Sequence, residues 1–248
     1  MLSFVLFKKN IMRNFLTAKW ENIIMANYPV DQDMLKPYLP HGVELDLYKG
    51  KAYVSLVGFM FKNTKLFNIP ILGLGTFEEV NLRFYVTRKE GNVVKRGVVF
   101  INETVPYKIV AWIANILYKE HYTVIPTSHK ITLHDNIKKI EYLWKVKNNW
   151  NRLSVLAEVK SEPIEIGGFE EFIFDHYYGY TKINNLTTEE YIIEHPQWRT
   201  NNILEFDVNC DFEEMYGKKF GFLNISAPSS VMIVDGSFVA VKWKRSRI

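Results

Sequence analysis

Short segments in which apolar and polar residues alternate constrain most strongly how this chain can fold. The clearest is TFEEVNLRFYV, residues 76–86, because a strand sends successive side chains to opposite faces. One face is apolar and consists of Val80, Leu82, Phe84 and Val86. The other is polar and consists of Glu79, Asn81, Arg83 and Tyr85. The apolar face predicts core packing, whereas the polar face lies either in bulk water or in an enclosed cavity.

Segments of this kind recur along the chain between turn-forming residues. Residues 130–135, 138–147 and 152–159 predict a meander. The segments SSVMIVD and SFVAVKW predict a closing hairpin around Asp235–Gly236. Roughly ten short strands with little helix are typical of a barrel or a highly curved sheet. We therefore expect a mainly β, largely antiparallel, single-domain fold with minor α.

One long helix is predicted at residues 104–120, TVPYKIVAWIANILYKE. Thr104 can cap its start, and Pro106 falls in the first turn, where proline is tolerated. Apolar residues at i, i+3, i+4, i+7 and i+8 form one broad stripe, by which such a helix packs onto a core. They are Ile109, Trp112, Ile113, Ile116 and Leu117.

Composition narrows the classes of function. With 48% hydrophobic and 15% aromatic residues, the 248-residue chain can bury a sizeable core. The net charge is only +4, and lysines and arginines are scattered among nearly as many acids, which argues against a nucleic-acid partner. The single cysteine, Cys210, excludes an internal disulfide and indicates a reducing cytoplasmic location.

The N-terminal segment MLSFVLF is apolar but too short to span a bilayer. Basic residues follow this segment instead of preceding it, so neither a signal peptide nor a membrane partner is expected. We interpret residues 1–11 as an extension and residues 12–248 as the single domain.

Motifs for phosphate binding and common hydrolytic chemistry are absent, as are HExxH and GxSxG. The six histidines never sit at paired metal-ligand spacing with a carboxylate helix, so we expect neither a metal ion nor a cofactor. Cys210 precedes the acidic segment DFEEMYG, which disfavours its thiolate and argues against a nucleophilic role.

Several motifs, in order and at consistent spacing, resemble the YqjF-like family, also called domain of unknown function 2071. The resemblance covers residue 12 to the C-terminus. It rests on FLTAKWENIIMANYPVDQDMLKPYLPHGVELDLYKGKAYVSLVGFMF, FEEVNLRFYV, GVVFINETVPYKIVAWIANILYKEHY, DHYYGYT and HPQW. This family has no established activity, and its architecture is similar to that of acetoacetate decarboxylase. The resemblance therefore implies a cone-shaped antiparallel β-barrel that encloses a cavity.

The resemblance also bears on the polar face. Acetoacetate decarboxylase carries a Tyr-x-Glu segment on a strand that lines its cavity, and Phe77–Glu79 looks like the counterpart. This match implies that Glu79 faces a cavity, and strand alternation then turns Asn81 and Arg83 to the same side. The resemblance thus favours the cavity over bulk water for this face.

The decarboxylase reacts through a lysine that forms a Schiff base, a step that requires a lysine of depressed pKa. Laying the corresponding segment ILYKEHYTVIP on the motif places Tyr122 at the lysine position and His121 at that of a proline. A phenol cannot form an imine. Lys108 and Lys119 are weak candidates that do not match the motif position, so we expect no Schiff-base chemistry.

The candidate ligand-binding residues are Glu79, Asn81, Arg83, Tyr122, His176 and Tyr180, with no catalytic residue assigned. A buried charge must be paired, so Arg83 either pairs with Glu79 or holds a ligand carboxylate bidentately. Tyr122 and His176 could donate hydrogen bonds or transfer protons, and the FDHYYGYT segment groups aromatic residues around His176.

Two interpretations remain. In the first, a β-barrel cavity binds a small organic acid or carbonyl compound, and any enzymatic activity is lyase- or isomerase-like acid–base chemistry. In the second, the protein is a non-catalytic structural or interaction protein with a hydrated polar core. A pocket of a few hundred cubic ångströms favours the first, and direct pairing of Glu79 with Arg83 favours the second. A homodimer is compatible with either.

Overall fold

The computed structural model describes residues 14–71, 73–117, 119–243 and 245–248, so the expected extension, residues 1–11, lies outside the described residues. Strands dominate these ranges. They are β1 (Asn14–Val30), β2 (Glu44–Leu45), β3 (Ala52–Leu66), β4 (Ile69–Pro70), β5 (Phe77–Glu90), β6 (Val93–Val105), β7 (Tyr122–Val124), β8 (Thr127–His134), β9 (Ile137–Val146), β10 (Asn149–Pro163), β11 (Tyr178–Asn184), β12 (Thr187–Glu194), β13 (Arg199–Asn209), β14 (Ser230–Lys242) and β15 (Ser246–Arg247).

The helical segments are short. They are α1 (Gln32–Leu35), η1 (Lys36–Tyr38), α2 (Lys108–Leu117), α3 (Phe169–Phe174), α4 (Phe212–Tyr216) and η2 (Lys218–Ile225). None of the helices in the described ranges has the length and apolar character needed to cross a membrane. The predicted mainly β, single-domain fold with minor α is confirmed.

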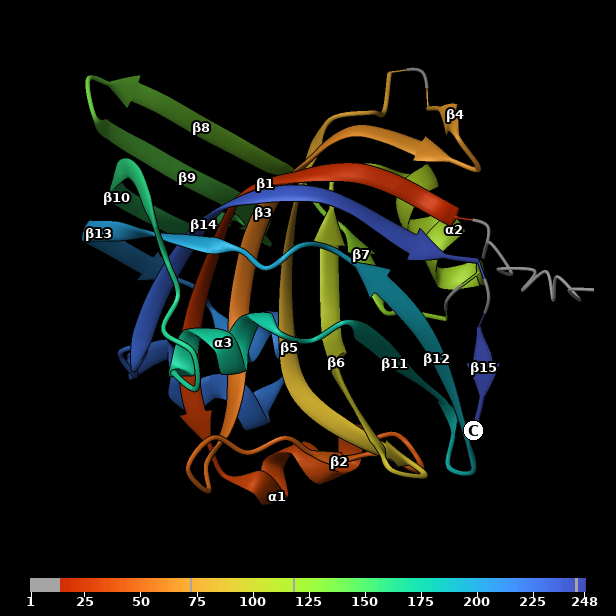
Figure 1. Ribbon diagram of the computed structural model, residues 1–248. Helices are drawn as coiled ribbons and strands as arrows, with labels where there is room; N and C mark the ends of the chain where they lie inside the picture. The colour runs from red at the N-terminus through yellow and green to blue at the C-terminus, as the bar shows by residue number, and fades with distance from the viewer. Residues whose placement is uncertain (1–13, 72, 118, 244) are drawn as a thin grey trace, which may run out of the picture.

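The sheet closes on itself. Its strands follow the order β12, β11, β6, β5, β3, β1 and β14, and β14 in turn pairs with β12, which closes the ring. The closing pairs are Ile193 with Val241 and Glu194 with Ala240. From β14 the sheet continues through β13, β10 and β9 to β8, and β8 and β9 project from one side of the molecule (Figure 1). The result is a ring of strands with a second sheet layer attached.

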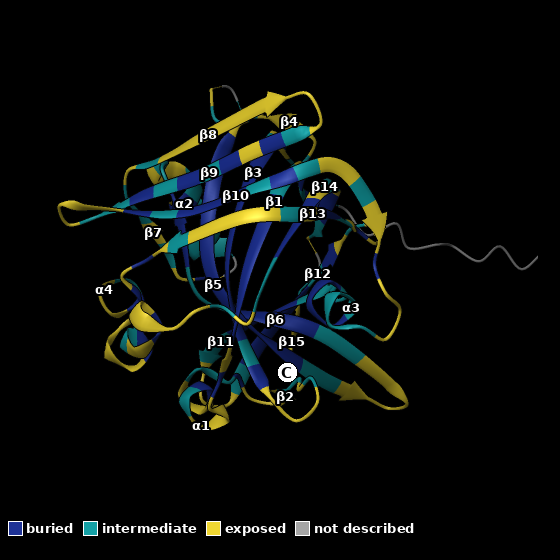
Figure 2. Ribbon diagram, turned by 90° about the vertical axis from the view of Figure 1, so that its left-hand side faces the viewer, coloured by how far each residue is buried: buried dark blue, intermediate teal, exposed yellow. Residues whose placement is uncertain are grey.

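Both faces of β5 are buried, from Phe77 to Val86. The predicted apolar face joins one core cluster together with residues of β9, β10 and α4, so it packs beneath the second sheet layer. Tyr85 belongs to another cluster, which also contains residues of β1 and β3. In Figure 2, β5 is drawn as buried along much of its length, while β8 is exposed. The polar face of β5 therefore does not lie in bulk water.

The expected hairpin at Asp235–Gly236 is wrong. These residues lie inside β14, which pairs with β1 on both sides of them, through Glu21 with Gly236 and Ile23 with Val234. Gly236 has φ +87°, and a Cβ there would come within 2.0 Å of the carbonyl oxygen of Trp20. Gly236 thus allows the backbones of β14 and β1 to approach each other closely. The strand continues through Asp235–Gly236 because β1 supplies its hydrogen-bonding partner.

The predicted helix boundaries are also wrong, because α2 spans only Lys108–Leu117. Thr104 is not a cap: it continues β6, pairing with Val80 of β5 and Thr123 of β7. Lys119 follows the helix with φ +56°. Backbone pairing on both sides therefore holds residue 104 in the sheet and outweighs the local capping signal.

The predicted apolar stripe of α2 is rotated. Ile109, Trp112 and Ile116 are 51%, 63% and 45% exposed, whereas Ala111 is buried. Ile113 and Leu117 do pack against core residues, as expected. The helix therefore buries Ala111 and leaves three of the five residues of the predicted stripe exposed.

The sheet is not wholly antiparallel. β6 pairs in parallel with β11, through Gly97 with Tyr178, and in parallel with β7. A Cβ at Gly97 would lie 2.6 Å from the carbonyl oxygen of Tyr178. The glycine therefore permits the close approach at this parallel seam, where the chain returns after α3 to complete the ring.

Candidate functional site

A cavity of about 90 Å³ lies on the polar side of β5. Glu79, Asn81 and Arg83 line it together, because alternation along one strand turns all three inward. Tyr122 of β7 joins them from the next part of the ring. The remaining wall is mostly apolar and includes Ile23, Met25, Val57, Phe59, Phe61, Phe100 and Trp198.

Glu79 is the hydrogen-bonding centre of this cavity. Its carboxyl group is 2% exposed, and Asn81 Nδ2 donates to Oε1 at 3.0 Å. The Tyr122 hydroxyl donates to Oε2 at 3.1 Å. Burial raises the pKa of Tyr122, so the phenol keeps its proton and remains a donor. Glu79 is thus held in one orientation from two sides.

Two further buried carboxyl groups face the cavity, Glu103 of β6 and Glu120, which precedes β7. Glu103 lies directly opposite Asn81 in the β5–β6 register. Glu120 Oε1 accepts hydrogen bonds from Thr181 at 2.6 Å and Tyr191 at 2.8 Å. Together with Glu79, these residues give the cavity three carboxyl groups. The three groups cannot all be ionised at once without strong repulsion.

Burial raises the pKa values of these three carboxyl groups. Burial raises the pKa of Glu79 to about 7 and that of Glu120 to about 7. Burial, together with the neighbouring carboxyl groups of Glu120 and Glu79, raises the pKa of Glu103 well above its ordinary range. At neutral pH the cluster consequently retains protons, so its members can both donate and accept hydrogen bonds.

Arg83 is the buried cation of the cavity. It is 9% exposed, and its Nη2 lies 3.6 Å from the sulfur of Met25. Its Nε is buried without a hydrogen-bond partner. Within the part of the chain that the structure describes, no carboxylate oxygen lies within 4.0 Å of the guanidinium. Arg83 and Glu79 are therefore not a direct ion pair.

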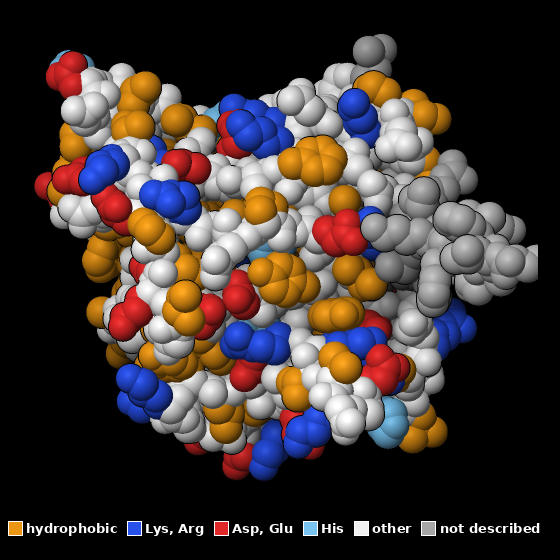
Figure 3. Space-filling model, viewed as in Figure 1, with side chains coloured by type: hydrophobic (Ala, Val, Ile, Leu, Met, Phe, Trp, Pro, Cys, Tyr) orange, Lys and Arg blue, Asp and Glu red, His pale blue; other side chains and the backbone are white. Residues whose placement is uncertain are grey.

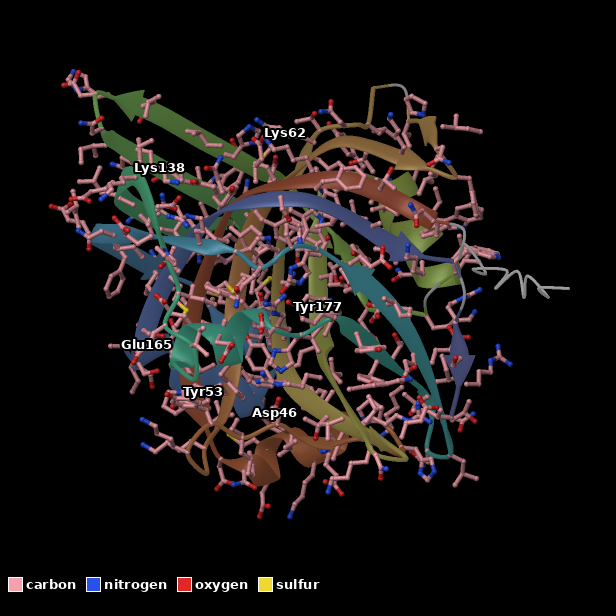
Figure 4. All side chains as sticks on the ribbon, in the orientation of Figure 1. Asp46, Tyr53, Lys62, Lys138, Glu165 and Tyr177 are labelled. Atoms are coloured by element: carbon pink, nitrogen blue, oxygen red, sulfur yellow. The ribbon has the colours of Figure 1, made fainter. Side chains whose placement is uncertain are left out.

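His176 and Tyr180 are not brought to this cavity. His176 Nε2 lies 3.1 Å from Asp46 Oδ2, which also accepts from Arg96 at 2.8 Å. Asp46 lies toward the β2 end of the molecule (Figure 4). Burial lowers the pKa of His176 to about 4, so this ring stays neutral beside Asp46. Tyr180 packs in the other core cluster, because β11 turns it to the opposite side.

The lysines named from the sequence do not reach the cavity. Lys108 and Lys119 are both exposed. Lys138 is the buried lysine that the sequence did not reveal, and it lies on β9, where it bonds to Asp235 and, at 3.1 Å, to Asn201 (Figure 4). Among the described residues, none of the side chains that line the cavity is a lysine.

Sequence reasoning missed Glu103 and Glu120. Glu103 was hidden because the helix was expected to begin at Thr104, which ended the strand before its inward-facing residue was considered. Extending the alternation of β6 past Phe100 could have found it only with knowledge of the register shift between Leu82 and Arg83. Glu120 looked like a charged helix end, and only its contacts with β11 and β12 bury it.

In residues 14–71, 73–117, 119–243 and 245–248, His, Cys, Asp and Glu side chains form no group of three suited to hold a metal ion. The carboxyl groups of Glu79 and Glu120 accept hydrogen bonds from asparagine, tyrosine and threonine side chains.

The fold is that of acetoacetate decarboxylase-like proteins. An acetoacetate decarboxylase of Legionella pneumophila aligns with a TM-score of 0.62 at 11% identity, over 94% of this chain and 86% of that one. An acetoacetate decarboxylase-like enzyme of Sphingomonas wittichii aligns with a TM-score of 0.63 at 10% identity, over 95% and 93%. The enduracididine biosynthesis enzyme MppR, complexed with pyruvate, aligns with a TM-score of 0.60 at 13% identity, over 97% and 93%.

Sequence similarity places the chain more narrowly. Residues 17–237 match DUF2071, a family of uncharacterized conserved proteins. The uncharacterized protein YqjF of Bacillus subtilis is 28% identical over 194 residues, which are 77% of each chain. The chain therefore belongs to the DUF2071 family, and the resemblance found in its motifs is confirmed.

Proposed function

We propose that the cavity binds a small organic acid or carbonyl compound and that Arg83 holds the carboxylate of the acid. The observation that carries this proposal is a buried guanidinium that faces a cavity without a carboxylate partner among the described residues. Burying an unpaired charge costs several kcal/mol, and a bidentate ligand carboxylate would offset that cost.

The neighbouring groups suit such a ligand. Protonated carboxyl groups of Glu79 and Glu103 would donate hydrogen bonds to a carbonyl oxygen, while ionised ones would repel an acid. Their upward-shifted pKa values favour the protonated forms near neutral pH. MppR, which shares the fold, is complexed with pyruvate, a small acid that also carries a carbonyl group.

Any catalysis at this site would be lyase- or isomerase-like acid–base chemistry. Glu79 would transfer a proton to or from the carbon next to a carbonyl, and Tyr122 would hold Glu79 in place through its hydrogen bond. A Schiff base would need a lysine in the cavity, and the described lining residues include none.

The proposal also covers the domain organisation, the location and the partners of the protein. Residues 12–248 would act as one domain in the cytoplasm, where the buried thiol of Cys210 stays reduced. Neither a membrane nor a nucleic acid would be a partner, since Lys and Arg are interspersed with Asp and Glu on the face shown in Figure 3. A homodimer remains compatible with this function.

Isothermal titration of pyruvate, acetoacetate and butyrate tests the proposal. We expect the wild-type protein to bind at least one of these acids and Arg83→Met to lose at least tenfold in affinity. Arg152→Met is the matched control, because Arg152 is a more exposed arginine that pairs with Asp207. Equal affinity of Arg83→Met and wild-type protein would refute the role of Arg83.

One observation favours the alternative, a non-catalytic structural or interaction protein with a hydrated polar core. The cavity of about 90 Å³ is smaller than the few hundred cubic ångströms typical of ligand pockets. In that case Glu79, Arg83 and Tyr122 would surround ordered water and stabilise the ring only. Failure of all three acids to bind wild-type protein would favour this alternative.

A further inference from the structure

A second chamber of about 80 Å³ adjoins the cavity. The two chambers share lining residues, among them Glu79, Ala114 and Tyr122. Arg83 lines the first chamber and not the second. The Glu79–Tyr122 hydrogen bond therefore stands at the junction, with the buried cation on one side and the second chamber on the other.

The second chamber is almost entirely apolar. Its walls come from β1, β3, the segment between β4 and β5, and the inner face of α2. Apart from Thr64, Glu79 and Tyr122, the lining side chains are Phe15, Leu16, Phe61, Leu66, Ile71, Leu74, Phe77, Ile109, Val110, Ile113 and Ala114. Ile109 is also 51% exposed, so this chamber lies close to the surface beside α2.

The two chambers also differ in the charged residues that line them. The side chains that line the second chamber include no Lys or Arg among the described residues, whereas the first contains Arg83. Arg83 and Glu79 are four residues apart on β5, about 13 Å at ~3.3 Å per residue. A ligand that uses both chambers must therefore be elongated, with its anionic group at one end.

We propose that the ligand class is an amphipathic monocarboxylic acid with an unbranched apolar tail. Its carboxylate lies on Arg83, its middle passes Glu79 and Tyr122, and its tail fills the chamber beneath α2. This inference rests on the proposed function, because it assumes that Arg83 binds the carboxylate. It adds a tail site that pyruvate and acetoacetate are too short to reach.

The physical basis is the transfer of methylene groups from water into an apolar chamber. An engineered apolar cavity of about 150 Å³ in another protein stays dry and binds benzene, so chambers of this combined size can hold a short chain. Each buried methylene strengthens binding about fourfold. Affinity should therefore climb steeply with chain length once the tail passes the junction.

Titration of wild-type protein with acetate, butyrate, hexanoate, octanoate and decanoate tests this dependence. We expect affinity to rise about fourfold per methylene beyond butyrate and to level off when the chamber is full. Hexanol and octanol, which carry the same tails without a carboxylate, should bind at least tenfold more weakly than the corresponding acids.

A plug in the second chamber separates the tail site from the head site. Val110→Phe adds a ring at a residue that lines the second chamber and not the first, so octanoate should lose about tenfold in affinity or more while butyrate is unchanged. Ile116→Phe is the matched control: it enlarges a side chain of the same helix that is 45% exposed and lines neither chamber. Thermal melting of both variants verifies that they fold.

The outcomes distinguish the two proposals. If butyrate and octanoate bind equally well, or if Val110→Phe leaves octanoate binding unchanged, the tail site is refuted while Arg83 can still hold a small acid. If no acid binds wild-type protein, the proposed function fails together with this inference. If Arg83→Met binds octanoate as tightly as wild-type protein and keeps the chain-length dependence, the tail binds but the head assignment is wrong.

Discussion

The two faces of β5 are equally buried but chemically opposite. On one side, Leu82 and Phe84 are fully buried among apolar residues beneath the second sheet layer. On the other, Glu79 and Arg83 are buried at the cavity with few polar partners. The apolar face stabilises the fold, whereas the polar face costs free energy on burial. Burial therefore has opposite energetic consequences on the two faces of one strand.

Leu82→Ala tests the apolar face and has the largest expected effect. Leu82 is 0% exposed, so the substitution removes buried surface and leaves a cavity. We expect the free energy of unfolding to fall by about 2–5 kcal/mol, measured by urea denaturation. A loss below about 1 kcal/mol would mean that the second sheet layer does not pack tightly on β5.

Arg83→Met tests the opposite face and should act in the opposite direction. Replacing an unpaired buried charge with an apolar side chain of similar length should raise the free energy of unfolding by about 1–3 kcal/mol. Urea denaturation without added acid measures the change. A marked destabilisation would show that Arg83 has a structural partner and would remove the contrast between the faces.

Glu79→Gln tests how titration affects the polar face. Glu79 in the unfolded chain releases its proton near pH 4.5, whereas in the folded protein its pKa is about 7. The folded state binds more protons between these values, so the free energy of unfolding falls as pH rises from 4.5 to 7 and is steady above. Relative to wild-type protein, Glu79→Gln should therefore gain on the order of 3 kcal/mol in the free energy of unfolding across this window.

Denaturation of both proteins at several pH values measures that difference. His176, whose pKa is lowered to about 4, contributes the opposite slope, but it is unchanged in the variant and cancels. Glu103 and Glu120 remain, so part of the wild-type slope persists. Glu165→Gln, which removes an exposed carboxyl group near α3, is the control for the substitution itself (Figure 4). A flat difference for Glu79→Gln would place its pKa near the ordinary value.

Tyr122→Phe has the smallest expected effect. It removes the hydroxyl that donates to Glu79 Oε2 and leaves the ring in place. Stability should fall by about 1 kcal/mol, and the pKa of Glu79 should rise further because a donor to its ionised form is lost. A titration of Glu79 followed by NMR would detect the rise, and a fall in pKa would contradict the assigned hydrogen bond.

The sequence predicted the fold class well, and it predicted part of the cavity lining. Alternation in residues 76–86 correctly separated the apolar face from Glu79, Asn81 and Arg83, because side-chain direction in a strand depends only on position. It could not find Glu103 and Glu120, because their burial depends on register and on contacts with β11 and β12. His176 was misplaced for the same reason, since proximity to aromatic residues in the sequence does not specify which side of the ring they face.

Local signals failed where long-range pairing competed with them. Asp235–Gly236 is a hairpin signal by itself, yet β1 holds it in a continuous strand. Thr104 is a good cap by itself, yet β5 and β7 hold it in the sheet. The sequence by itself determined the strands, their two faces and the family, because these follow from periodicity and motif order. Only the tertiary structure decided that the polar face is enclosed, because closure of the ring through β12 and β14 is what separates it from water.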